Sequence, residues 1–238
     1  MGRAYEVRKA SIAKTGAAKA KLYSMYAKEI YNAAKKSTDL DANPTLKRLV
    51  DKAKKEQVPA DIIKRAIDKV NSGVDETYFS VRYEGFGPSP STVIIDCLTD
   101  NVNRTISYIR GAFSKAKAKL GVLGSVSHMY DNLCVISFKG LSEEETLEAL
   151  INGEVDVSDI EVEDEMITIY GKPADLFKIK NAIIEAKPDV IFELDEITTL
   201  PHDRITLETE DLEQFQKLLM LLDEIEDVQQ VYHNVNIE

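Results

Sequence analysis

The stretch Arg82–Phe113, RYEGFGPSPSTVIIDCLTDNVNRTISYIRGAF, carries the clearest structural signals in the middle of this chain. Its segment Ser91–Leu98 is rich in apolar strand formers, which predicts a strand buried on both faces. The prolines and glycines of Gly85–Pro90 predict a break before that strand, because proline lacks an amide donor and glycine allows unusual backbone angles. Short capping side chains follow at Thr99–Asn101, and apolar residues then recur every three or four positions as far as Leu120. The stretch therefore predicts strand, turn, strand and helix, the beginning of a mixed α/β domain.

The same domain is predicted to extend in both directions from this stretch. A first strand is expected at Phe79–Glu84, and the alternation in Ser125–Tyr130 predicts a further strand. Near the end of the chain, a helix is expected from about Asp211 to Glu224 and a strand around Gln229–Val235. Because one helix and one strand cannot form a domain alone, we expect them to complete the central domain.

The region before this domain is predicted to be helical. The apolar pattern indicates a helix from about Ala17 to Lys36. Asn43-Pro44 is a helix start signal, because asparagine caps and proline is tolerated in the first turn. A third helix follows Pro59 and ends before Gly73. These elements predict a small domain of three amphipathic helices.

The region from Leu133 to about Leu194 predicts a separate domain with the order strand, helix, strand, strand, helix, strand. Ser142–Glu145 is a capping-box pattern that opens its first helix. This order is the split βαβ arrangement of ferredoxin-like domains. The predicted fold class is α+β, with a helical domain at 1–73, a central α/β domain at 74–131 plus 203–238, and an inserted ferredoxin-like domain at 132–202.

Charge is distributed unevenly along the chain, whose net charge is −11. Residues 1–72 hold 17 Lys and Arg against 8 Asp and Glu, whereas residues 141–238 hold 6 against 27. Residues 73–140 are nearly neutral, with 7 against 6. This separation indicates a basic contact surface at one end and a surface that repels polyanions at the other.

The basic residues of the first helix are regularly spaced. Lysines recur every seven residues from 14 to 35, and at 3.6 residues per turn such a series drifts only ~20° per step and forms one stripe. Lysine and arginine gain binding free energy by releasing the counterions of phosphates. The candidate nucleic-acid-binding residues are Arg3, Arg8, Lys9, Lys14, Lys21, Lys28, Lys35, Arg104 and Arg110. An ordinary solvated helix face fits the same pattern.

Other polar motifs favour structural roles. The Gly85–Pro90 turn lacks the lysine of a phosphate-binding loop, which favours a tight strand connection. Asp100, Asn101 and Arg104 stand at a helix start, where capping explains residues of these types. At both motifs a structural role is therefore favoured over a phosphate-binding loop or a polar site.

Nothing in the chain indicates catalysis, a metal or another cofactor. The histidines at 128, 202 and 233 lack partners at metal-ligand spacing, and no serine lies in a nucleophile-elbow pattern. Cys97 and Cys134 lie in apolar strand patterns, which predicts buried reduced thiols. No apolar run approaches the ~20 residues of a membrane span, and no signal core begins the chain. We therefore expect a non-enzymatic cytoplasmic protein with neither a membrane nor a small-molecule substrate as partner.

Several ordered motifs resemble the YebC/PmpR family of bacterial and organellar regulatory proteins. They are RYEGFGP at 82–88, LTDNVNRT at 98–105, Gly121 with Gly124-Ser125-Val126, the segment from Asn43-Pro44 to Ile67, and Asp227–Asn234. The N-terminus departs from the family pattern, since Gly2-Arg3-Ala4-Tyr5 replaces a segment that commonly contains Trp and His. The chain thus resembles a divergent branch of that family.

The resemblance implies a three-part layout and a nucleic-acid partner, either DNA or ribosomal RNA. Family members have been described both as DNA-binding transcriptional regulators and as translation factors that act on the ribosome. The resemblance thus implies transcription or translation regulation, with the ribosome as a candidate partner. An alternative from a different class is a protein-interaction module that uses the acidic C-terminal half without binding nucleic acid.

Overall fold

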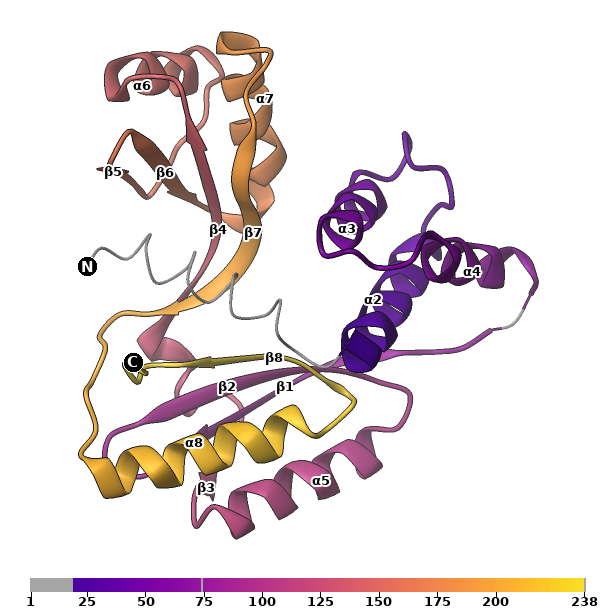
Figure 1. Cartoon of the computed structure of the whole chain (residues 1–238), viewed down its shortest axis with the longest axis vertical. Helices are drawn as coiled ribbons and strands as arrows, with labels where there is room; N and C mark the ends of the chain where they lie inside the picture. The colour runs from indigo at the N-terminus through magenta and orange to yellow at the C-terminus, as the bar shows by residue number, and fades with distance from the viewer. Residues whose placement is uncertain (1–18, 74, 238) are drawn as a thin grey trace. The chain divides into compact units, whose positions relative to one another are not determined.

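A computed structural model describes residues 19–73 and 75–237 of the chain (Figure 1). Residues 129–202 form one compact unit, and residues 19–128 with 203–237 form the other. The elements of the larger unit are α2 (Lys19–Ala34), α3 (Pro44–Lys55), α4 (Ala60–Asn71), β1 (Phe79–Phe86), β2 (Thr92–Thr99), α5 (Val102–Lys115), β3 (Lys119–Leu120), α8 (Thr209–Asp223) and β8 (Val228–His233). Those of the smaller unit are β4 (Tyr130–Lys139), α6 (Glu143–Asn152), β5 (Asp159–Glu163), β6 (Met166–Gly171), α7 (Leu176–Ala186) and β7 (Phe192–Pro201).

The three predicted N-terminal helices are present within the described residues. The Asn43 side chain caps α3 by accepting a hydrogen bond from the Leu46 amide at 3.1 Å. The same side chain donates to the Ala33 carbonyl at 2.9 Å, which fixes the end of α2 to the start of α3. Apolar residues at helical spacing, among them Tyr26 and Ile30, form one buried cluster between the helices. The apolar period thus predicted the packing of this part correctly.

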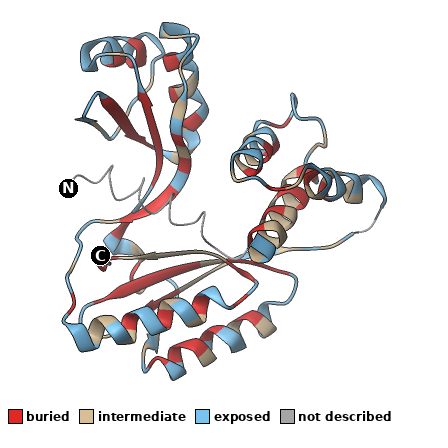
Figure 2. Cartoon of the chain, viewed as in Figure 1, coloured by how far each residue is buried: buried red, intermediate tan, exposed pale blue. Residues whose placement is uncertain are grey.

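The central sheet is antiparallel, with the strand order β3-β1-β2-β8. Helices α5 and α8 cover one of its faces (Figure 1), and each turns its buried residues toward the sheet (Figure 2). Ile109 and Phe113 of α5 and Phe215 of α8 form this core with Val93 and Ile95 of β2. Since β8 pairs with β2, the C-terminal helix and strand complete the central sheet, as predicted.

Two predictions about the edges of this sheet were wrong. Gly85 and Phe86 remain in the β1 ladder, because Gly85 has no side chain and an added Cβ would lie 2.3 Å from the Phe113 ring. Helix α5 ends at Lys115 and does not reach Leu120, which pairs with Gly85 as part of β3. Proximity to the aromatic ring, which is distant in sequence, keeps the glycine in the strand.

The strand predicted at Ser125–Tyr130 was also wrong, because a buried carboxylate organises this segment. Glu84 of β1 accepts hydrogen bonds from the amides of Gly124 (2.8 Å), Val126 (2.7 Å) and Ser127 (3.0 Å). Burial alone would raise the pKa of Glu84, but these amide hydrogen bonds bring it below its ordinary value. A loop and a 3₁₀ turn at Ser127–Met129 therefore replace the expected strand.

The smaller unit has the predicted ferredoxin-like order β4, α6, β5, β6, α7 and β7. Its antiparallel sheet has the order β5-β6-β4-β7. The capping box at Ser142 and Glu145 is present, with both hydrogen bonds formed. Strand β7 runs from Phe192 to Pro201 and so continues beyond Leu194, where the predicted pattern of this domain ended. The α+β fold with an inserted ferredoxin-like part is confirmed, while the predicted domain boundaries stay predictions.

Candidate nucleic-acid interface

Three lysines of the predicted stripe lie on α2 and each forms an intramolecular ion pair. We call Lys21, Lys28 and Lys35 the lysine stripe. Lys21 Nζ lies 2.8 Å from Asp223 Oδ1, and Lys35 Nζ lies 2.7 Å from Asp75 Oδ1. The predicted cations that precede α2 lie outside the described residues: Arg3, Arg8, Lys9 and Lys14.

The partner of Lys21 and Lys28 is an acidic turn between α8 and β8. We define the acidic turn as Asp223, Glu224, Glu226 and Asp227. Lys28 Nζ lies 3.4 Å from Glu226 Oε1 and 3.3 Å from Asp227 Oδ1, and its side chain is only 13% exposed. The hydroxyl of Ser24 on α2 donates to Glu226 Oε1 at 2.9 Å. Carboxylates therefore occupy the positions on these lysines that phosphate oxygens would take.

Asp227 is the centre of this arrangement and is nearly buried. Its Oδ2 accepts hydrogen bonds from Arg104 Nη2 and Thr105 Oγ1, both at 2.9 Å, while Oδ1 faces Lys28. Burial alone would raise the pKa of Asp227, but the bonds from Arg104 and Thr105 and the charge of Lys28 bring it below its ordinary value. A buried charge is tolerated when partners of this kind surround it. One carboxylate thus joins α2, α5 and the acidic turn.

The polar residues at the start of α5 cap the helix and pair with the carboxylates around it. Asn101 caps the helix by accepting a hydrogen bond from the Arg104 amide at 3.0 Å, as the sequence favoured. Besides Asp227, the Arg104 guanidinium pairs with Asp100 at 2.7 Å. Two carboxylates therefore hold Arg104, one of the predicted nucleic-acid-binding residues.

A second basic surface lies on α5 and the segment after it, as far as the first residue of β3. We define the α5 face as Tyr108, Arg110, Lys115, Lys117 and Lys119. All four cations are exposed, and none of their side chains forms an ion pair or hydrogen bond with any residue in 19–73 or 75–237. Tyr108 is 55% exposed. This surface therefore presents unneutralised charge together with an exposed aromatic ring.

Sequence reasoning identified Arg110 but omitted the tyrosine. The apolar period of α5 contains Ile109 and Phe113 and excludes position 108 from the buried side. That period could therefore have revealed Tyr108 as an exposed aromatic residue. On the helical domain, Arg48, Lys54 and Lys64 likewise have no ion-pair partner within the described part of the chain.

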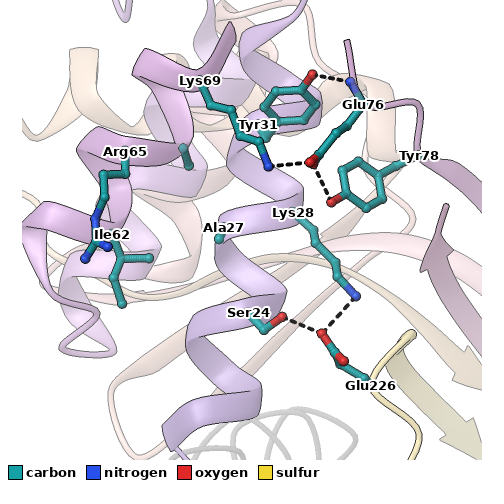
Figure 3. A pocket seen from close by; sticks show the side chains of 11 residues that line it. Ser24, Ala27, Lys28, Tyr31, Ile62, Arg65, Lys69, Glu76, Tyr78 and Glu226 are labelled. Carbon is teal, nitrogen blue, oxygen red and sulfur yellow. Dashed lines mark hydrogen bonds and ion pairs between the residues drawn. The ribbon is translucent and has the colours of Figure 1, made fainter. Parts of the chain in front are cut away.

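A cavity of about 390 Å³ lies between α2, α4, the segment after α4 and Glu226 (Figure 3). Its floor contains Ala27 and Ile62. Lys69 Nζ lies 2.6 Å from Glu76 Oε1, and the Tyr78 hydroxyl donates to Glu76 Oε2 at 2.8 Å. Burial and this hydrogen bond raise the pKa of Tyr78. Because Lys28, Lys69 and Arg65 already pair with carboxylates, the cavity offers phosphate less free charge than the α5 face.

Other chemistry has little support in the described structure. Cys97 and Cys134 are buried free thiols, as predicted, and burial raises their pKa values to about 12 and about 11. Both thiols are therefore protonated near neutral pH and weakly nucleophilic. Across the described ranges, no three His, Cys, Asp or Glu side chains gather as metal ligands would. Within the same residues, no helix combines the length and apolarity of a membrane span.

The chain is similar to known proteins along its whole length. The family model of the second and third domain of TACO1/YebC proteins matches residues 78–235, and the model of their N-terminal domain matches residues 3–73. A Vibrio parahaemolyticus protein named "Probable transcriptional regulatory protein" is 52% identical over 238 residues, or 100% of both chains. An Alteromonas mediterranea protein with the same designation is 48% identical over 235 residues, or 98% of each chain.

A solved structure is also similar. The crystal structure of a conserved hypothetical protein from Aquifex aeolicus has a TM-score of 0.75 and 34% identity, and the match covers 95% of this chain and 93% of that one. The two family models account for nearly all of the sequence, and relatives about half identical match it from end to end. The chain therefore belongs to the TACO1/YebC family.

Proposed function

We propose that this protein is a cytoplasmic regulator of gene expression that binds nucleic acid and is not an enzyme. The observation that carries the proposal is the α5 face, where four exposed cations have no ion-pair partner within the described residues and lie near an exposed tyrosine. Such cations gain free energy by displacing the counterions of phosphates. The names of the full-length relatives support a role in regulating transcription.

The acidic part of the chain supports a restricted contact surface. Residues 129–202 hold 18 Asp and Glu against 5 Lys and Arg. A surface of this charge repels a polyanion. Nucleic acid therefore binds the larger unit, through the α5 face, the unpaired cations of α3 and α4, and the N-terminal cations Arg3, Arg8, Lys9 and Lys14. Lys21 and Lys28 join this contact only after they separate from the acidic turn.

Binding should depend steeply on salt. The test is fluorescence anisotropy of the full chain with labelled RNA and DNA oligonucleotides from 50 to 300 mM salt. We expect log affinity to fall linearly with log salt, with a slope of roughly −0.7 to −0.9 per phosphate contacted. No binding of either nucleic acid at the lowest salt would contradict the proposal and favour the protein-interaction module with its acidic surface.

The physiological target is DNA or ribosomal RNA, and a second experiment separates them. Lysate is sedimented on a sucrose gradient with and without nuclease, and the protein is detected with an antibody. Co-migration with ribosomal particles would support a translation factor. A protein that stays at the top of the gradient at gentle salt would favour the transcriptional role.

A further inference from the structure

We propose that the α5 face binds an unpaired strand of nucleic acid, with Tyr108 stacking on a base while Lys115 holds a phosphate further along the strand. This inference rests on the proposed function and specifies the form of nucleic acid that the surface takes. Cations alone bind duplex and single strand alike, because both present phosphates. The aromatic ring is the feature that favours an unpaired strand, whose bases are free to stack.

Tyr108 has the exposure that stacking requires. Its side chain is 55% exposed, whereas its neighbour Ile109 is fully buried in the core of the central sheet. An exposed tyrosine gains nothing from the core, and its hydroxyl has no hydrogen-bond partner within the described residues. Its ring is thus free to pair with the face of a base, an interaction that any base can make.

Lys115 lies where a strand that runs along α5 from Tyr108 would pass. Tyr108 and Lys115 are seven residues apart, so they lie on the same side of α5 and about 10 Å apart along its axis. That distance is on the order of three nucleotides of a strand stacked at the 3.4 Å spacing of double-stranded DNA, so Lys115 would meet a phosphate beyond the one next to the stacked base. Arg110 is exposed but lies about 200° around the helix from Tyr108, so it adds charge to the opposite flank, while Lys117 and Lys119 continue the charge beyond the end of α5.

Gly111 lies on the line between Tyr108 and Lys115. It is three residues after the tyrosine and four before the lysine, and residues at these spacings are neighbours on a helix surface. An added Cβ at Gly111 would meet nothing within 4 Å, so packing does not require glycine there. Glycine inside a helix is less stable than alanine. A strand that passes from Tyr108 to Lys115 would cross this position closely, which gives the missing side chain a function.

The test compares a labelled 12-nucleotide RNA without internal pairing with the duplex that it forms with its complement. Anisotropy is measured on the full chain at 100 mM salt. Tyr108→Ala should weaken single-strand binding by roughly tenfold and leave duplex binding unchanged, while Tyr108→Phe should retain both. Met220→Ala is the matched control, because Met220 is a 59% exposed side chain on the neighbouring helix α8.

Gly111→Gln provides a second test. If position 111 had only a structural role, this substitution would leave single-strand affinity unchanged. Glutamine at position 111 should raise the melting temperature of the larger unit, which contains α5, because glutamine is a better helix former than glycine. It should also weaken single-strand binding severalfold by obstructing the strand. Unchanged single-strand affinity in both Tyr108→Ala and Gly111→Gln would overturn the inference while leaving the proposed function intact. Failure of the unmodified chain to bind either RNA would instead contradict the proposed function itself.

Discussion

The lysine stripe of α2 and the α5 face look alike in the sequence but differ in the structure. Both are helical surfaces rich in lysine or arginine. Lys28 is 13% exposed and faces two carboxylates, whereas Arg110 and Lys115 are exposed and have no ion-pair partner in the described chain. The stripe therefore stabilises the attachment of α2 to the acidic turn, and the α5 face retains its charge for a partner.

The difference shows that net charge and available charge are separate quantities. A lysine bound to a carboxylate releases no phosphate counterions unless the carboxylate first leaves. The buried and exposed ion pairs between α2 and the acidic turn also differ in how much they contribute to stability. Asp227 is almost inaccessible, and loss of a buried charge partner is costly, whereas an exposed pair such as Lys21–Asp223 contributes little.

The largest effect is expected from Asp227→Asn, which removes the charge that joins α2 and α5. Arg104, Thr105 and Lys28 would lose their shared carboxylate, and we expect the free energy of unfolding to fall by about 2–3 kcal/mol. Urea unfolding followed by circular dichroism measures this change. Asp223→Asn is the matched control, because the Asp223 side chain is 72% exposed. Equal effects of the two variants would contradict a central role for Asp227.

The stability of the protein at acid pH should also depend on the Asp227 carboxylate. Because the pKa of Asp227 in the folded protein lies below its ordinary value of 3.8, the stability that it contributes is present above that value. This contribution is lost as the pH falls through the lowered pKa. The stability difference between the wild type and Asp227→Asn should therefore be constant from pH 5 to 7 and shrink below pH 4. A difference that does not change down to pH 3 would contradict this assignment.

Neutralising the acidic turn should have a smaller effect and act on binding. In Asp223→Asn with Glu226→Gln, Lys21 loses its carboxylate partner and becomes available to phosphates, while Lys28 loses one of its two partners and keeps Asp227. Nucleic-acid affinity should rise severalfold in the anisotropy assay. Glu224→Gln with Glu213→Gln removes the same charge from side chains that hold no ion pair within the described residues. If this control raises affinity equally, overall charge and not release of the lysines is responsible.

The smallest effect is expected from exchanging one exposed pair. Lys21→Asp and Asp223→Lys should each lower stability slightly, and the double variant should recover most of the loss. The coupling between them should be about 0.2–1 kcal/mol, as is usual for exposed pairs. A double-mutant cycle in urea unfolding measures it. Coupling well above this range would mean that the exposed Lys21–Asp223 pair contributes as much to stability as the buried Asp227 carboxylate.

Local signals predicted most of the fold. The Asn43 cap, the Ser142 capping box and the apolar periods of α3 and α5 depend on neighbours in sequence, and the structure confirms them. The failures depend on distant contacts. Glu84 accepts hydrogen bonds from the amides of Gly124, Val126 and Ser127, and the Phe113 ring requires glycine at position 85, neither of which a local pattern reveals.

In the candidate site, too, local patterns predicted some features, and contacts with distant residues account for the others. The spacing of the lysine stripe predicted one face of α2, and Lys21, Lys28 and Lys35 do lie on one helix. Their partners could not be predicted, because Asp223 and Asp227 follow about 200 residues later. The exposure of Arg110 follows from the apolar period of α5. Whether either set of cations binds nucleic acid remains a prediction.

The most direct test compares two charge reversals in the full chain at one salt concentration. Arg110→Glu with Lys115→Glu alters the α5 face, and Lys21→Glu with Lys28→Glu alters the stripe. We predict that the α5 variant loses more than tenfold in nucleic-acid affinity and that its salt slope falls by about 2. The stripe variant should lose less affinity and more stability. A stripe variant that abolishes binding while the α5 variant binds normally would contradict the account.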